Sequence, residues 1–363
     1  MEEIRLALKE KEKISEIFIG VHLLDFAVRD LRERPLGNRL GIVTDSQVEA
    51  VLGSRLKENL IQEGIKVDLF AIRPGEKSKR WETVESIFEW MADLGFDRKS
   101  SLLGLGGGVV GDIAGFSSSL YMRSIPYAQI PTTLLAQVDS SLGGKTAIDL
   151  PMRKNLLGTF YQPRRVYIDP SVLATLPFEE IRNGLAEVIK SAISRDRHLF
   201  EFLESHREAI QEGGEEVMER IVSRCCRIKS AVVMEDEMDL GLRQVLNFGH
   251  TVGHAIEAYT DYRVSHGKAV SMGMSAETVL STRMGMLPME ETRRILRLLH
   301  DHDLPTEIPK SYDIERLIGL MHSDKKAEAG KIAVILPTSI GVASVKKGVP
   351  VSSIKSALQE VQG

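Results

Sequence analysis

Residues 101–120 read SLLGLGGGVVGDIAGFSSSL. The apolar start at 101–105 predicts a buried strand, and segment 111–120 predicts a helix. Gly106, Gly107 and Gly108 lie between these segments, and Gly111 begins the predicted helix. Their spacing between a strand and a helix is typical of a dinucleotide-binding turn, where backbone amides approach a pyrophosphate. A tight turn that only packing requires is the alternative.

The acidic partner of such a turn is not where it is usually found. A dinucleotide-binding turn is commonly followed about 20 positions later by an acidic residue, and none stands there in this chain. Asp45, at the end of a predicted strand over 40–44, could bind the ribose hydroxyls from a different strand–helix unit.

Strands and helices alternate through the first half of the chain. The predicted strands cover 40–44, 67–72, 127–130 and 166–168, and the predicted helices 47–63 and 81–94. This alternation predicts a parallel sheet with helices on its faces. After Pro177 the segments have helical period to about Leu304, and 331–336 (KIAVIL) could form a late strand or hairpin. We therefore predict an N-terminal Rossmann-like α/β domain over 1–177 and an all-helical C-terminal domain over 178–363, with the active site in the cleft between them.

Composition narrows the class of protein. A length of 363 residues favours two domains, and the net charge of −4 lacks the basic footprint of a nucleic-acid-binding protein. No apolar run approaches the ~20 residues that span a membrane, and the N-terminus lacks the pattern of a signal peptide. The only cysteines, Cys225 and Cys226, are neighbours and form no disulfide framework. These features predict a cytoplasmic protein with reduced thiols that acts on small molecules.

A stripe of polar residues stands out in the second half. Its members are four, three and four positions apart: Arg243, Asn247, His250 and His254. If the segment is helical throughout, all four project from one face. Apolar residues surround them, so the stripe is predicted to be buried, and buried ionisable groups need partners. Three ionisable groups and an amide on one stripe favour a functional site over ordinary core residues.

Two histidines of the stripe could bind a metal ion. His250 and His254 are at positions i and i+4, but HTVGH lacks the glutamate of a HExxH protease, which disfavours peptide hydrolysis. His266 follows in a Ser-His-Gly loop, and Glu187 and Lys190 share a face of another predicted helix. Two histidines and one glutamate would suit an open zinc site.

A third cluster surrounds a glycine-rich loop. It contains Asp139, Lys145, Lys154 and Asn155. Two lysines on either side of such a loop indicate an anion cradle. Solvated loop lysines are the alternative.

Longer blocks extend over most of the chain, in order from about residue 40 to 345. They are PGEKSK, GGGVVGDIAGF, YMRS, PTTLLAQVDSSLGGKTAID, KNLLGTFYQP, TLPFEEIRNGLAEVIK, LRQVLNFGHTVGHAIE, SHGKAVSMGM and SDKK. In this set and order the chain resembles the 3-dehydroquinate synthases of the sugar phosphate cyclase superfamily. The resemblance implies a homodimeric lyase of aromatic amino acid biosynthesis (the shikimate pathway) that uses NAD and a divalent metal, Zn or Co. Members convert 3-deoxy-arabino-heptulosonate 7-phosphate to 3-dehydroquinate and phosphate by oxidation, phosphate elimination, reduction, ring opening and aldol closure.

The resemblance also implies a role for particular residues. The metal ligands would be Glu187, His250 and His266, which moves His254 from the metal to the substrate. The residues that contact NAD would be Asp45, Glu76, Lys79, Gly107, Gly108, Val109, Val110, Gly111, Asp112, Thr132, Thr133, Asp139, Lys145, Lys154 and Thr175. The substrate would meet Lys145, Asn155, Lys229, Arg243, His254, Lys325 or Lys326, and Arg123 from a second subunit. The catalytic groups would be Asp139, Lys145, Lys190, Arg243, Asn247 and His254.

Three positions depart from the family pattern. Ser124 and Arg153 stand where glycine is usual, and Lys268 stands where glutamate is frequent. None of them is a ligand in the implied set. Arg153 and Lys268 add positive charge near the expected site, which bears on substrate tuning.

Three other functions share features with this sequence. A sister cyclase, such as one that makes 2-deoxy-scyllo-inosose or a valiolone precursor, would share NAD, metal and fold. Arg243 with Lys229 argues against it, because only a sugar acid needs a carboxylate-binding pair. A metal-dependent alcohol dehydrogenase would have no use for the phosphate-directed lysines. A binding module without activity is disfavoured because every implied site residue is present.

Overall fold

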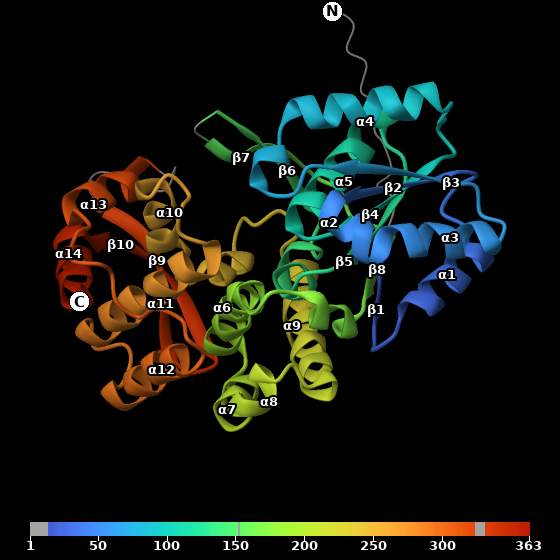
Figure 1. The fold of residues 1–363 in the computed structure, drawn as a ribbon. Coiled ribbons are helices and arrows are strands. Elements are labelled where there is room, and N and C mark those ends of the chain that lie inside the picture. The colour runs from blue at the N-terminus through green and yellow to red at the C-terminus, as the bar shows by residue number, and fades with distance from the viewer. Residues whose placement is uncertain (1–13, 152, 324–330) are drawn as a thin grey trace, which may run out of the picture.

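A six-stranded parallel sheet forms the first part of the molecule. The computed structural model describes residues 14–151, 153–323 and 331–363 (Figure 1). The strands lie in the order β1-β8-β5-β4-β2-β3, and all pairs are parallel. Their bounds are β1 Glu16–Ile19, β2 Leu40–Asp45, β3 Val67–Ile72, β4 Ser101–Gly106, β5 Tyr127–Pro131 and β8 Arg165–Ile168. This confirms the predicted α/β class, and β1 is an edge strand that the sequence pattern did not reveal.

Helices cover the sheet. They are α1 Leu24–Glu33, α2 Ser46–Val48, α3 Ser54–Gln62, α4 Trp81–Asp93 and α5 Gly108–Leu120. The helix predicted over 47–63 is interrupted by a π-helical turn, Glu49–Gly53. In α4, Val84, Ile87 and Met91 recur at helical spacing and are fully buried. α5 begins at Gly108, three residues earlier than predicted.

An antiparallel hairpin replaces the loop expected around the third cluster. β6 (Lys145–Leu150) pairs with β7 (Arg153–Phe160). Much of β7 is exposed, so it lacks the clear alternation of buried and exposed side chains that indicates a strand. The hairpin carries Lys145, Lys154 and Asn155.

The second part is helical apart from one hairpin. Its helices are α6 Phe178–Arg195, α7 Arg197–Ser205, α8 Arg207–Gln211, α9 Glu215–Glu235, α10 His250–Tyr259, α11 His266–Arg283, α12 Met289–Asp301, α13 Ile314–Ser323 and α14 Val351–Glu360. β9 (Lys331–Ser339) and β10 (Val342–Pro350) form an antiparallel pair, which the 331–336 pattern indicated and which corrects the expectation of a purely helical part. Val334 and Leu336 alternate inward and are buried beside α11. Within the described ranges, no helix is long and apolar enough to cross a membrane.

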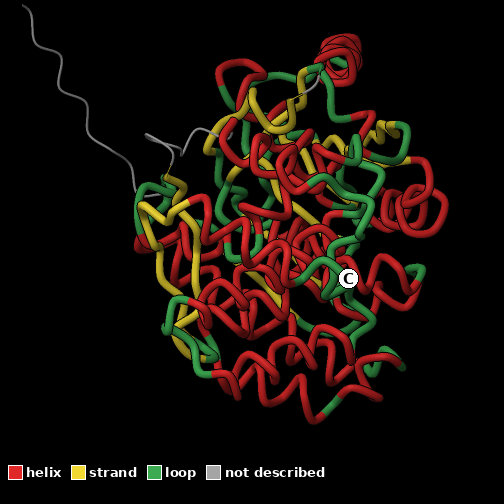
Figure 2. Tube along the Cα trace, turned by 90° about the vertical axis from the view of Figure 1, so that its left-hand side faces the viewer, coloured by secondary structure: helices red, strands yellow, loops and turns green. Residues whose placement is uncertain are grey.

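The two parts share a hydrophobic core. In Figure 1, α6 and α9 lie between the sheet on the right and the C-terminal helices on the left. Figure 2, turned by 90°, shows helices and loops along the lower edge of the molecule. One cluster of buried side chains joins Leu134, Val138 and Ile168 to Leu185 and Ile189 of α6. At Gly184 on α6, a Cβ atom would lie 2.6 Å from Leu134 Cβ and from Leu135 N, so α6 packs directly against that backbone. The division after residue 177 stays a prediction.

Both cysteines are predicted to resist alkylation in the folded chain. Cys225 and Cys226 are free and buried on α9, and Cys226 Sγ donates to Gln137 O. Burial raises the pKa of Cys226 to about 12, which leaves about a thousandfold less reactive thiolate than a pKa of 9 would. We expect no modification by iodoacetamide at pH 8 under native conditions and two modified thiols in urea, measured by intact mass. Rapid native labelling would contradict the described burial.

Candidate active site

The glycine turn lies where the strand order of the sheet reverses. From β2 the chain continues outward to β3, and then returns to the other side of β2 as β4. Such switch points leave a crevice at the carboxyl ends of the strands. Asp45 ends β2, and Gly106 ends β4 immediately before α5. The N-terminus of α5 therefore presents free backbone amides at this crevice.

Close packing around the glycines brings further predicted residues to the same place. A Cβ at Gly106 would lie 2.7 Å from Val110 Cβ, one at Gly107 would lie 3.1 Å from Thr133 Cγ2, and one at Gly108 would lie 3.0 Å from Ser140 Oγ. Close packing therefore requires small residues at this turn, as the alternative explanation of the glycines predicted. Among the described residues, Thr132 Oγ1 is buried without a hydrogen-bond partner. An unpaired hydroxyl beside free amides fits a polar ligand.

The β6–β7 hairpin adds charged groups to the crevice. Lys79, which is buried, forms an ion pair with Asp112 on α5 and donates to Asn155 Oδ1. Lys154 Nζ lies 3.6 Å from a carboxylate oxygen of Glu76. Burial raises the pKa of Asp112 to about 6, against the opposing effect of Lys79. The hairpin and the dinucleotide turn thus form one polar cluster.

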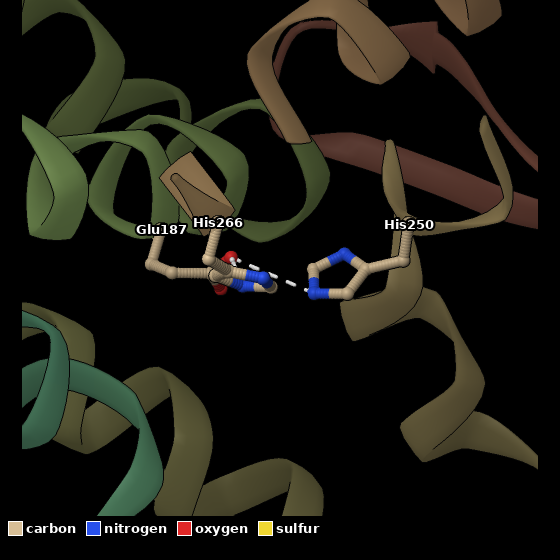
Figure 3. A group of neighbouring side chains, drawn as sticks. All are labelled: Glu187, His250 and His266. Atoms are coloured by element: carbon tan, nitrogen blue, oxygen red, sulfur yellow. Dashed lines mark ion pairs between the residues drawn. The ribbon is translucent and has the colours of Figure 1, made fainter. Parts of the chain in front are cut away.

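Three residues meet from three different helices. Glu187 lies on α6, His250 begins α10 and His266 begins α11 (Figure 3). Glu187 Oε1 is 3.6 Å from His250 Nε2 and 3.3 Å from His266 Nε2. One ligand atom from each residue lies within 4.8 Å of the others. The structure thus groups the three residues that the resemblance implied, and not the pair His250 and His254.

The arrangement fits a zinc-like ion. Two ligands about 2.1 Å from a tetrahedral metal lie roughly 3.4 Å apart, close to both observed separations. Glu187 Oε1 is buried and has no hydrogen-bond partner within the described part of the chain. Two imidazoles and a carboxylate are the ligand types that divalent zinc prefers in open sites.

The charges of the three residues depend on burial and on their neighbours. Burial acts to raise the pKa of Glu187, but Lys190, His250 and His266 outweigh it and hold the pKa well below its usual range. Burial lowers the pKa of His250 to about 3, so its ring is neutral. At His266 burial is outweighed by Glu187 and Glu257, which raise the pKa to about 10. A metal ion would compete with this proton.

The stripe 243–254 is not one helix, which corrects the expectation of a continuous face. Leu242–Asn247 is a 3-10 helix, Gly249 has φ +79°, and α10 starts only at His250. The change of direction separates Arg243 and Asn247 from the two histidines by a turn. His254 stays close to this group of three residues, since its ring centroid is 5.2 Å from that of His250.

A second polar centre forms around Asp139. Asp139 lies in the π-helical segment Ala136–Ser140, and its Oδ1 is 2.6 Å from Lys229 Nζ of α9. Burial lowers the pKa of Lys229, although Asp139 acts in the opposite direction. The buried Arg243 donates to the carbonyl oxygens of Gly143 and Glu237. These acceptors are neutral, so the guanidinium can still bind an anion.

The remaining predicted residues lie in different surroundings. Lys145 forms an ion pair with Asp239, and Thr175 Oγ1 donates to Val172 O at the end of a 3-10 helix. Arg123 is exposed at the far end of α5 from the glycine turn. Lys325 and Lys326 lie outside the described residues.

Comparison with known proteins decides the family. A profile for "3-dehydroquinate synthase N-terminal" matches residues 69–183, and one for "3-dehydroquinate synthase C-terminal" matches residues 184–327. A curated 3-dehydroquinate synthase of Desulforamulus reducens is 43% identical over 95% of this chain and 96% of its own length. The chain belongs to the 3-dehydroquinate synthase family. Another member, from Thermodesulfovibrio yellowstonii, is 40% identical over 99% of this chain and its whole length.

Solved structures place this family beside other cyclases. A 2-epi-5-epi-valiolone synthase from Streptomyces hygroscopicus with NAD+ and Zn2+ bound is 29% identical, with a TM-score of 0.88 over 98% of both chains. A 2-deoxy-scyllo-inosose synthase complexed with carbaglucose-6-phosphate, NAD+ and Co2+ is 25% identical, with a TM-score of 0.86 over 96% of both chains. An iron-containing alcohol dehydrogenase from Thermotoga maritima, at 18% identity and a TM-score of 0.66 over 98% of this chain and all of its own, shares the fold.

Sequence reasoning gave no role to two acidic residues near the site, although Glu257 ends the family block LRQVLNFGHTVGHAIE. Glu257 Oε1 lies 3.5 Å from His266 Nδ1 and 3.6 Å from Lys154 Nζ, so one buried carboxylate contacts both the metal triad and the hairpin. Asp239, the partner of Lys145, lies just before Arg243. Glu257 follows His254 by three positions on α10, and that spacing could have indicated it.

Gly249→Ala is predicted to destabilise the chain more than the same change at Gly285. Both glycines have positive φ, which costs a β-carbon about 1–2 kcal/mol. At Gly249 a Cβ would also lie 2.5 Å from Met274 Cγ and 2.8 Å from Val270 O, whereas Gly285 has open space around it. Overpacking typically adds about 1–3 kcal/mol. Thermal unfolding should show the larger drop in midpoint for Gly249→Ala, and equal drops would contradict the packing argument.

Proposed function

We propose that this chain converts 3-deoxy-arabino-heptulosonate 7-phosphate to 3-dehydroquinate and phosphate, with bound NAD and a divalent metal, Zn or Co. The near-complete overlap with curated members at 40–43% identity supports the reaction. The observation that carries the choice of substrate is the buried Arg243, which acts electrostatically on Lys229 and donates only to carbonyls in the bonds described above. Arg243 and Lys229, the latter paired with Asp139, supply buried donors that match the carboxylate of a sugar acid, which the sugar phosphates of the sister cyclases lack.

The dinucleotide is proposed to bind at the carboxyl ends of β2, β4 and β5. The α5 amides would hold its pyrophosphate, and Asp45 would bind ribose hydroxyls. Lys79 and Lys154 of the adjoining polar cluster would neutralise the phosphates from the hairpin side. When bound, NAD accepts and later returns one hydride from a secondary alcohol of the substrate.

Glu187, His250 and His266 are proposed to hold the metal. Once bound, the ion would lower the pKa of adjacent substrate hydroxyls and polarise their oxygens. Asp139, Lys190 and Asn247 would orient ring hydroxyls around it. Lys190, on α6 and paired with Glu187, would donate a hydrogen bond to a hydroxyl at the ion.

The phosphate is proposed to bind on the hairpin side. Lys145 and Asn155 come from β6 and β7, and His254 comes from α10. Lys325 or Lys326 would add a further cation. Cations and amide donors around a leaving phosphate dianion stabilise the charge that develops as the C–O bond breaks.

A homodimer in the cytoplasm completes the proposal. α5 has 13 residues and is therefore about 20 Å long, and Arg123 lies beyond its end opposite to the glycine turn. Arg123 is thus too far to serve the dinucleotide turn of its own chain, and a second subunit could present it to the phosphate. Analytical ultracentrifugation should find a dimer, and a fully active monomer would overturn this part.

The decisive experiment is a paired substrate assay. The full chain with NAD and zinc is incubated with 3-deoxy-arabino-heptulosonate 7-phosphate or with glucose 6-phosphate, and phosphate and 3-dehydroquinate are measured. We expect both products from the sugar acid and neither from glucose 6-phosphate. Phosphate released only from glucose 6-phosphate would favour a sister cyclase instead.

A further inference from the structure

Glu277, on α11, lies outside every set of site residues named above. Its side chain is 1% exposed, and its Oε2 accepts a hydrogen bond of 2.7 Å from Gly249 N. The backbone amides of Thr251 and Val252, in the first turn of α10, also act on the carboxyl group by hydrogen bonding. A buried carboxyl group is costly unless its interactions offset the loss of water. Its place beside the start of α10 therefore calls for a role.

The packing of α10 on α11 brings Glu277 to that place. A Cβ at Gly273 would lie 1.9 Å from Gly249 O and 2.9 Å from Gly253 N, so only a glycine lets the two helices approach so closely. Glu277 is four residues further along α11 and so faces α10 on the same side. Its carboxyl group thereby reaches the first turn of α10, where backbone amides have no partner within the helix.

The same peptide group links Glu277 to a metal ligand. The N–H of Gly249 and the C=O of Phe248 belong to one planar unit. The N–H donates to Glu277, and the C=O lies 3.2 Å from His250 Nδ1. His250 Nε2, on the other side of the ring, faces Glu187 Oε1 at 3.6 Å.

We propose that Glu277 is a positioning residue that orients His250 for the metal through the Phe248–Gly249 peptide. By fixing the peptide N–H, Glu277 aims the Phe248 carbonyl at Nδ1. The carbonyl then accepts a hydrogen bond from Nδ1–H, which keeps the proton on Nδ1 and leaves the Nε2 lone pair for the ion. A residue that hydrogen-bonds a metal-ligating histidine from outside the coordination sphere usually contacts the ring directly. Here one peptide group lies between Glu277 and the ring, and its two hydrogen bonds strengthen each other.

The role does not depend on the ionisation of Glu277. An oxygen of the group accepts the Gly249 N–H whether the carboxyl is charged or neutral. Glutamine has an oxygen of the same reach, whereas methionine has a similar length and no comparable acceptor. The inference rests on the proposed metal site, so the test measures metal binding rather than turnover.

The test compares Glu277→Met with Glu277→Gln. The dissociation constant for zinc is measured by competition with a chelator, and cobalt absorption reports the ligand geometry. We expect Glu277→Met to weaken zinc binding by about 10–100-fold, the usual effect of losing an outer partner, and Glu277→Gln to stay near wild type. Ser281→Ala is the control, because it removes another buried hydrogen bond of α11, to Pro337 O, away from the triad.

The outcomes separate the two proposals. A wild-type chain that binds no zinc would overturn the metal site itself. Wild-type affinity in a folded Glu277→Met chain would overturn only the role of Glu277. If that variant does not fold, nitrogen-15 NMR of the zinc-loaded wild type decides: a proton on His250 Nδ1 with zinc on Nε2 is expected, and zinc on Nδ1 would overturn the relay.

Discussion

Glu187→Gln is expected to lose turnover by at least ~10³-fold, since the several kcal/mol that a Lewis acid contributes correspond to about that factor. Glu187 Oε1 is the point where the contacts of His250 and His266 converge, and a neutral amide oxygen is a poorer ligand for a divalent cation than a carboxylate. Metal content after dialysis should fall together with activity. In the wild type, exhaustive chelation should abolish turnover, and added zinc or cobalt should restore it.

The matched control for this change is Glu180→Gln. Glu180 is an exposed acid at the start of the same helix, so its loss changes the charge of α6 without touching the triad. Full turnover after exhaustive chelation, or equal turnover in the two variants, would show that the reaction does not depend on a metal held by Glu187.

Arg243→Ala is expected to lower kcat/KM for the sugar acid by ~10²–10³-fold. Truncating one member of a buried charged pair typically costs about 2–5 kcal/mol, much of it because the partner charge is left unpaired. Arg243→Lys should recover only part of this, because an ammonium cannot make the paired hydrogen bonds of a guanidinium. Steady-state kinetics with purified protein measures both changes.

Arg227→Ala serves as the control for the arginine series. Arg227 is exposed on α9, and its removal changes the net charge by the same amount. Wild-type kcat/KM in Arg243→Ala would show that the carboxylate binds elsewhere, and the choice of a sugar acid would then rest on sequence similarity alone.

The sequence predicted the sheet well because its strands are buried on both faces. β2 and β4 are continuous apolar runs that end at Asp45 and at the glycine turn. Such runs can be recognised in the sequence without knowing which strands they pair with. β1 and β7 were not predicted, since their half-exposed residues follow no clean period. The late hairpin was indicated because residues 332–336 (IAVIL) form a short, uninterrupted apolar run that is rich in β-branched side chains.

The three proposed metal ligands could not be predicted from sequence spacing alone. His250 and His254 have the separation of a shared metal ligand pair, and nothing in the local sequence shows that the helix begins only at His250. Glu187 and His266 are distant in sequence and meet through the packing of α6 and α11, which only tertiary structure or resemblance can supply. Glu277 could not be predicted at all, because its partner is a backbone amide of another helix.

Gly184 has a consequence for how the molecule can move. Because a β-carbon there would meet the backbone of Leu135, α6 packs directly against the segment after Leu134, and we expect the two to move together. Glu187 and Lys190 come from the one, and Asp139 from the other. Any movement of α6 relative to the glycine turn would therefore carry this segment with it. Glu187, Lys190 and Asp139 would then move together toward the glycine turn, with their relative positions unchanged.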